Sequence, residues 1–208
     1  MRFLLVVLFG GFLAAGISAR ADTLQLVVVG DSLTAGYQLA PEKAFPVQLQ
    51  NALAERGHDV AVINASVSGD TSSGGLSRLD WSVGPEADAV ILELGANDAL
   101  RGIPPARTRD NIDAMVQRLT ERGLPVLVAG MLAPRNLGEE YAAEFDPIFS
   151  EVSSTYGATL YPFFLEGVAL DPALNLPDGM HPNGDGVSVI VQNMLPTVEQ
   201  LLARAAGS

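Results

Sequence analysis

The chain has no cysteine, which excludes disulfide bonds, metal sites built on thiolates and a cysteine nucleophile. Its stability must therefore come from a hydrophobic core. Basic residues are also scarce, since 12 Lys and Arg stand against 24 Asp and Glu, and Lys43 is the only lysine. A net charge of −12 leaves little to bind a phosphate backbone, so we expect no nucleic-acid partner.

Long apolar runs are lacking everywhere except at the start of the chain. Residues 1–21 combine Arg2, an apolar stretch and the small-residue end Ala19-Arg20-Ala21, which is typical of a secretory signal cleaved near Ala21. An uncleaved anchor is the alternative, but the run is shorter than the roughly 20 residues of a spanning helix. We expect an exported protein, periplasmic or secreted, with a single domain over residues 22–208 and no stable membrane insertion.

Five short segments rich in Val, Ile and Leu predict strands that are buried on both faces, as in a parallel sheet. These segments are Leu24–Val29, Val60–Ile63, Ala89–Leu94, Val126–Ala129 and Ala158–Tyr161. Helices are predicted over Val47–Arg56, Asn111–Arg122 and about Asp185–Ala205. The alternation predicts a three-layer α/β/α sandwich of about five parallel strands, with ligands beyond the carboxyl ends of the strands.

Ser32 directly follows the first predicted strand, within Gly30-Asp31-Ser32-Leu33. A serine at such a turn can project its hydroxyl into a cleft and offer its backbone N–H to an oxyanion. The structural alternative is a helix N-cap, a common role of serine at the start of a helix. The second glycine of Gly-x-Ser-x-Gly is missing, which argues against the nucleophile elbow of α/β-hydrolases.

A serine nucleophile needs a base, and the chain offers only His58 and His181. His58 lies in a polar turn at the amino end of the second strand, which is the wrong edge of the sheet, and we expect it to be solvated. His181 lies near the end of the long loop Phe163–Asn183, and Asp178 is three residues upstream. A single turn can bring that carboxylate to the imidazole. An aspartate that only closes a turn is the alternative.

Two further strand ends supply candidate donors for an oxyanion. Gly69 follows the second strand, where its backbone N–H can approach a ligand closely. Asn97 follows the third strand, and its side-chain amide can donate. The alternatives are an ordinary turn glycine and a helix-capping asparagine. Because parallel strands end at one edge, Ser32, Gly69 and Asn97 are expected to lie together.

Four sequence blocks resemble those of the SGNH hydrolase family, which is also known for its GDSL motif. The blocks are Gly30-Asp31-Ser32-Leu33, Gly69, Gly95-Ala96-Asn97-Asp98 and Asp178-Gly179-Met180-His181-Pro182. They span almost the whole chain after the predicted signal, in the family's order. The first block continues as Ser-Leu-Thr-Ala-Gly-Tyr up to Tyr37, which is similar to the exported bacterial arylesterases and the multifunctional thioesterase/lysophospholipases of this family.

This resemblance implies a flavodoxin-like sheet, no cofactor and a small-molecule ester as substrate. It makes Ser32 the nucleophile and His181 the base, oriented by Asp178. It also implies an oxyanion hole formed by the N–H groups of Ser32 and Gly69 with the Asn97 amide. Aryl esters and short-to-medium acyl esters are favoured, and longer acyl chains of thioesters and lysophospholipids are the alternative.

Apolar residues that follow the fourth and fifth strands are candidates for the substrate-binding wall. Leu132, Pro134 and Leu137 follow the fourth strand, and Phe163 follows the fifth. Apolar walls around a few polar donors suit an acyl or aryl group. Equally, these side chains can simply cover the sheet.

Two other functions fit parts of the pattern. Metal-assisted hydrolysis would use Asp31, Asp98, Asp178 and His181 as ligands, but one well-placed histidine and no cysteine argue against a zinc site. We therefore expect no metal. A non-catalytic flavodoxin-like module would share the fold. The loop after the first strand, however, lacks the dense Ser/Thr run that would hold a flavin phosphate, and a phosphoacceptor domain would need a lysine after the last strand.

Overall fold

The computed structural model describes residues 23–207, so the predicted signal at residues 1–21 lies outside the described residues. Five parallel strands form one sheet in the order β2-β1-β3-β4-β5. The strands are β1 (Leu24–Gly30), β2 (Val60–Asn64), β3 (Ala89–Glu93), β4 (Val126–Ala129) and β5 (Thr159–Tyr161). This flavodoxin-like order creates a topological switch point between β1 and β3, where such folds bind ligands.

The five strands lie within one residue of their predicted ends, so the prediction of a parallel α/β sheet is confirmed. Every residue of β3 and β4 is buried, because helices cover both faces of the sheet. The continuous apolar runs in the sequence are the consequence of this double burial. Glu93, the last residue of β3, is the exception, since it is a charged residue type with no exposed surface.

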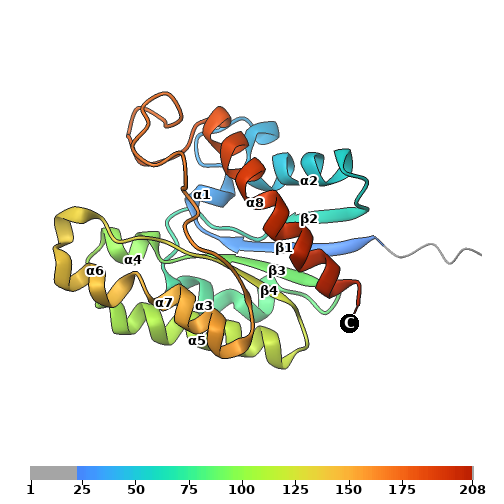
Figure 1. Cartoon of the computed structure of the whole chain (residues 1–208), viewed down its shortest axis with the longest axis horizontal. Helices are drawn as coiled ribbons and strands as arrows, with labels where there is room; N and C mark the ends of the chain where they lie inside the picture. Colours follow the sequence, from blue (N-terminus) through green and yellow to red (C-terminus); the bar gives the residue numbers. More distant parts are fainter. Residues whose placement is uncertain (1–22, 208) are drawn as a thin grey trace, which may run out of the picture.

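Helices lie on both faces of the sheet (Figure 1), with α1, α2 and α8 on one face and α3 to α7 on the other. The helices are α1 (Ser32–Ala35), α2 (Phe45–Glu55), α3 (Ser72–Ser82), α4 (Ala96–Leu100), α5 (Pro105–Glu121), α6 (Glu139–Phe145), α7 (Ile148–Tyr156) and α8 (Gly184–Ala205). Two 3₁₀ turns, η1 (Pro41–Lys43) and η2 (Arg135–Leu137), complete the list. Within residues 23–207, no helix combines the length and apolarity needed to cross a bilayer.

The three predicted helices exist, but each begins earlier than expected. α2 begins at Phe45 and α8 at Gly184, within two residues of the prediction, whereas α5 begins at Pro105, six residues before Asn111. Proline is accepted in the first helical turn because the N–H that it lacks would have no partner there. The buried face of α5 also extends back to Thr108, whose hydroxyl donates to Asp98.

The segment between β5 and α8 is irregular, as predicted, but hydrogen bonds fix it to the start of α8. The N–H of Leu176 donates to the His181 carbonyl at 2.7 Å, and the N–H of Asn183 donates to the Leu174 carbonyl at 2.9 Å. Asn183 Oδ1 then accepts the N–H groups of Asp185 and Gly186 and caps α8. The loop that carries His181 is therefore anchored to a long helix whose inner face is buried in the core.

This anchoring predicts an unusual cost for an alanine inside a helix. A Cβ on Gly186 would lie 2.1 Å from the Leu174 carbonyl oxygen, whereas on Gly184 it would meet only the flexible Lys43 side chain, at 3.1 Å. Overpacking against backbone costs about 1–3 kcal/mol, which exceeds the roughly 1 kcal/mol that alanine gains over glycine in a helix. Gly186→Ala should therefore lower the melting temperature clearly, and Gly184→Ala should not. Equal effects of both in thermal unfolding would contradict this packing.

Candidate active site

Ser32 lies at the first residue of α1, immediately after β1 and beside the switch point of the sheet. The N-cap of this helix is Asp31, whose Oδ1 accepts the N–H of Leu33 at 2.9 Å. The capping role considered for Ser32 is thus taken by its neighbour. The Ser32 hydroxyl is left to face the cleft, where its partner is His181.

Three side chains predicted to act together are joined in series. Ser32 Oγ lies 2.9 Å from His181 Nε2, and His181 Nδ1 lies 2.7 Å from Asp178 Oδ2. In this arrangement Nδ1–H donates to the carboxylate, so Nε2 is unprotonated and accepts the serine hydroxyl proton. This tautomer is the one that a general base needs.

Asp178 uses its two oxygens for different purposes. Oδ1 accepts the backbone N–H groups of Met180 and His181 at 2.9 and 3.0 Å and closes a tight turn, while Oδ2 holds the imidazole. The turn and the contact with the imidazole therefore exist side by side. The two backbone N–H donors of His181 and Met180 lower the pKa of Asp178 from 3.8 to about 2, so the group is ionised at neutral pH.

Tyr37 is a contact that the sequence reasoning did not single out. Its ring lies 4.5 Å from the His181 ring, centroid to centroid, at an angle of 38°. The imidazole is therefore held by an aromatic face as well as by its two hydrogen bonds. The only signal for this contact in the sequence is the position of Tyr37, five residues after the serine.

The candidate oxyanion donors lie on loops that are held by other side chains. Asn97, in α4, donates through Nδ2 to Asp31 Oδ2 at 2.9 Å and is not the N-cap, which is Gly95. Gly69 adopts a φ of 83°, which favours glycine, and its carbonyl accepts from Arg101 Nη2 at 2.8 Å. Asn97 and Arg101 are one helical turn apart, so α4 and its C-cap carry one candidate donor and a hydrogen bond to the carbonyl of the residue that carries the other.

Arg78 holds the loop that follows β2 and the end of β1 through hydrogen bonds. Its Nε donates to Asp70 at 2.6 Å, next to Gly69, and its other nitrogens donate to the carbonyls of Ala65 and Gly30. One side chain therefore ties the loop after β2 to the end of β1. This role was not predicted, because the partners range from eight to 48 residues away in the chain and follow no local pattern.

An apolar cavity of about 390 Å³ opens beside the serine. Leu132, Pro134 and Phe163, the candidates for the substrate-binding wall, line it together with Ser32, Asn97 and His181. Leu137 does not line it within the described residues, because its side chain, at the end of η2, packs against the core instead. Phe163 both lines the cavity and packs on the core.

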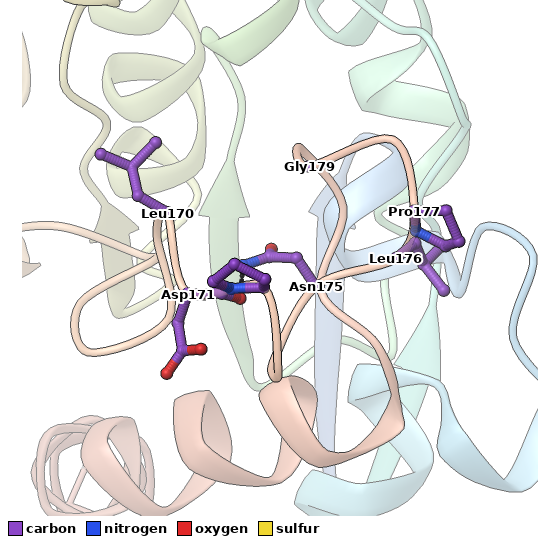
Figure 2. Close-up of a pocket in the computed structure, with 7 residues that line it drawn as sticks. Leu170, Asp171, Asn175, Leu176, Pro177 and Gly179 are labelled. Carbon is purple, nitrogen blue, oxygen red and sulfur yellow. Dashed lines mark hydrogen bonds between the residues drawn. The ribbon is translucent and has the colours of Figure 1, made fainter.

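The long loop also encloses a second hollow of about 350 Å³, shown in Figure 2. Leu170, Asn175 and Gly179 line both hollows, so the loop forms a thin wall between them. Asn175 is buried, and its Nδ2 donates to the carbonyls of Val168 and Asp171 at 2.7 Å each. These bonds keep the wall of the serine cavity in place.

His58 and Asp98 lie outside the series of side chains that joins Ser32, His181 and Asp178. His58 is partly exposed, as expected of a solvated turn residue, and its Nε2 also lies 3.1 Å from Glu199 Oε1 of α8, a hydrogen bond that the sequence did not predict. Its turn leads into the amino end of β2, away from Ser32. Within residues 23–207, no group of three or more His, Asp or Glu side chains is arranged to hold a metal ion. The buried carboxylate of Asp98 is instead occupied by Ser72 and Thr108.

A parallel α/β sheet whose carboxyl edge carries a serine, a histidine and an aspartate linked by hydrogen bonds is characteristic of serine hydrolases. Residues 28–189 match the model of the GDSL-like lipase/acylhydrolase family. The chain belongs to this family, as its four sequence blocks predicted, and it is a carboxylic ester hydrolase.

Several characterised relatives share most of their length with this chain. An arylesterase of Vibrio mimicus is 40% identical over 183 residues, which cover 88% of this chain and 90% of that protein. The thioesterase 1/protease 1/lysophospholipase L1 of Escherichia coli is 34% identical over 186 residues, with coverages of 89% and 87%. The crystal structure of TesA matches with a TM-score of 0.81 at 39% identity, and covers 85% of this chain and 99% of that one.

The geometry predicts that Asp178→Asn lowers kcat strongly without unfolding the protein. Asparagine can still accept the two backbone N–H groups, but its amide cannot accept Nδ1–H, so the histidine takes the wrong tautomer. A loss of about 10³- to 10⁴-fold is expected for ester hydrolysis.

Asp171→Asn is the matched control, since Asp171 Oδ1 closes a similar turn in the same loop by accepting the N–H of Ala173 at 2.9 Å. It should keep kcat within about threefold, because no histidine depends on it. Similar kcat values for the two variants, measured at equal thermal stability, would refute the orienting role of Asp178.

Proposed function

We infer that this chain is an exported serine esterase in which Ser32 is the nucleophile, His181 the general base and Asp178 the residue that orients the base. The observation that carries this assignment is the continuous series of two hydrogen bonds, 2.9 and 2.7 Å long, from Ser32 Oγ through the imidazole to Asp178 Oδ2. Both distances are within the reach that proton transfer requires.

The reaction is acyl transfer to water by way of an acyl-enzyme. Ser32 Oγ attacks the ester carbonyl carbon while His181 Nε2 takes the hydroxyl proton. The tetrahedral intermediate then collapses, and His181 returns this proton to the leaving alcohol oxygen. Water, deprotonated by His181, attacks the acyl carbonyl carbon and forms a second tetrahedral intermediate. As this collapses, the bond between the acyl carbon and Ser32 Oγ breaks, His181 returns the proton to Ser32 Oγ, and the carboxylic acid leaves. Throughout, Asp178 stabilises the imidazolium that forms transiently.

The oxyanion of the intermediate would be bound by the N–H groups of Ser32 and Gly69 and by the amide of Asn97. Their placement at three strand ends supports this assignment, as does the fixing of Gly69 by Arg101 and of Asn97 by Asp31. Each well-placed donor contributes about 2.7–4 kcal/mol to lowering the barrier. Removing the Asn97 amide should therefore lower kcat about a hundredfold or more.

The cavity supports aryl esters and short-to-medium acyl esters as substrates. It is lined mainly by apolar side chains, with the polar groups concentrated at Ser32, Asn97, Asn175 and His181. Its volume suits a single aryl or acyl group, which needs apolar walls and few polar contacts. The similarity to an arylesterase points the same way.

Longer acyl chains, as in lysophospholipids or thioesters, are the second candidate substrates. Four exposed apolar side chains surround the mouth of the cavity and could continue the binding surface for a chain that extends beyond it. They are Leu100, Leu132, Leu170 and Met180, with exposed fractions of 56%, 43%, 91% and 50%. The relative named as a thioesterase and lysophospholipase also supports this possibility.

Export, and a single catalytic domain over residues 22–208, complete the proposal. The signal-like pattern of residues 1–21, with its small-residue end at Ala21, supports export to the periplasm or beyond. An exported enzyme would seldom meet acyl-CoA, and a net charge of −12 would repel that polyanion. Simple esters are therefore better candidates than CoA thioesters.

Ser32→Ala tests the assignment directly. We expect hydrolysis of p-nitrophenyl acetate, butyrate and octanoate to fall by about 10³-fold or more, because the nucleophile is lost while the fold remains. The wild-type kcat/KM values across the three esters rank the acyl lengths, and a maximum at octanoate would favour the longer-chain alternative.

Ser77→Ala is the control, since Ser77 is an exposed serine of α3 whose hydroxyl donates only locally, to the Gly74 carbonyl. This variant should behave as the wild type. Activity of Ser32→Ala equal to that of Ser77→Ala would remove Ser32 from the mechanism and leave the catalytic group elsewhere.

A further inference from the structure

Two carboxyl groups lie completely buried beneath the serine. Asp31 follows β1 and Glu93 ends β3, and both have no exposed surface. The sheet register pairs Gly30 with Glu93, so the two acids meet at the switch point. Their hydrogen-bond partners within residues 23–207 are backbone amides, a hydroxyl and an asparagine amide, with no lysine or arginine among them. Burying two unpaired negative charges side by side would be very costly.

The hydrogen bonds distinguish the two acids. Asp31 has a donor on each oxygen: Leu33 N–H on Oδ1 and Asn97 Nδ2 on Oδ2, both at 2.9 Å. Glu93 has donors on Oε2 only, from Asp31 N–H and Thr34 Oγ1 at 3.3 Å each. Glu93 Oε1 is buried and has no donor among the described residues. Glu93 Oε1 needs no donor if it carries the proton of a neutral carboxylic acid.

The electrostatics agree with this distribution. Burial, and then the negative charge of Asp31, raise the pKa of Glu93 well above its usual value. Burial also raises the pKa of Asp31, to about 6, but hydrogen bonds from Leu33 and Asn97 oppose that rise. At neutral pH, burial and the donors together favour Asp31 as the ionised member of the pair and Glu93 as the neutral acid.

We propose that Glu93 is a positioning residue, which as a neutral acid donates a hydrogen bond to Asp31 and thereby fixes the Asn97 amide for oxyanion binding. The inference rests on the proposed function, because it concerns the orientation of an oxyanion donor. Asn97 Nδ2 has two protons. One is held by Asp31, which leaves the other free to point into the cavity that Asn97 lines.

A neutral Glu93 also limits the negative charge under the site. An ionised Glu93 would add a second charge where an oxyanion must form, and would oppose the preorganised donors. Gly30 makes the arrangement possible, since a Cβ there would lie 2.1 Å from Thr34 Oγ1 and 2.9 Å from Glu93 Oε2. The first glycine of the motif therefore clears space for the buried acid pair.

The test compares Glu93→Gln with Glu93→Leu. Glutamine keeps a donor for Asp31 and an acceptor for Asp31 N–H, so kcat should stay within about threefold of wild type. Leucine removes both, so kcat should fall about thirtyfold or more while KM changes little, because the lost interaction is realised in the transition state. Equal losses in the two variants, or a wild-type kcat in Glu93→Leu, would overturn the proposal.

A double-mutant cycle separates positioning from a general structural effect. In an Asn97→Ala background the donor that Glu93 fixes is already gone, so Glu93→Leu should cost less than about threefold in kcat. An undiminished loss in that background would show that Glu93 acts by another route, and would contradict the proposal.

Infrared spectroscopy provides a readout that does not depend on activity or on the folding of Glu93→Leu. Wild-type protein at neutral pH should show the carbonyl band of a protonated carboxylic acid, and Glu93→Gln should lack it. Absence of this band from the wild type would overturn the proposal even if Ser32 were the nucleophile. If the band were present and Ser32→Ala fully active, the proposed function would fail while the neutral acid remained.

Discussion

The hydrogen bond between Ser32 and His181 joins residues 149 positions apart in the chain, and the surrounding fold is what closes that distance. The serine is fixed at the end of a buried central strand. The histidine lies on an irregular loop, which would be free to move without its hydrogen bonds to the start of α8. Asp178 and Tyr37 then hold the imidazole from two sides. Catalytic geometry here depends on a loop made rigid by a helix.

Three carboxyl groups near this hydrogen bond differ in burial and in protonation state. Exposed Asp178 is ionised because backbone N–H groups bind it, whereas buried Glu93 is neutral because burial and the nearby charge of Asp31 outweigh its two donors. Asp31 lies between these extremes and connects the cap of α1 to the amide of Asn97. The same residue type serves different purposes because burial and donors differ from place to place.

The strands and the candidate triad were predictable because both follow from local patterns. Buried parallel strands produce continuous apolar runs, their carboxyl ends share one edge, and three residues suffice for a turn between Asp178 and His181. Contacts made across the fold were not predictable. Arg78, Tyr37 and Glu93 have partners far away in the sequence, and the direction of the Leu137 side chain depends on a short 3₁₀ turn. The sequence contains one indication of the role of Glu93, which is a charged residue at the end of an otherwise apolar strand.

Covalent labelling tests most directly whether His181 activates Ser32. The protein would be incubated with an aryl phosphonate ester, which reacts with activated serines, and followed by intact mass and peptide mapping. One adduct per chain, on the peptide that contains Ser32, is predicted, and the reaction should be about 10³-fold slower in His181→Ala. Labelling of another residue, or an unchanged rate in His181→Ala, would contradict the account.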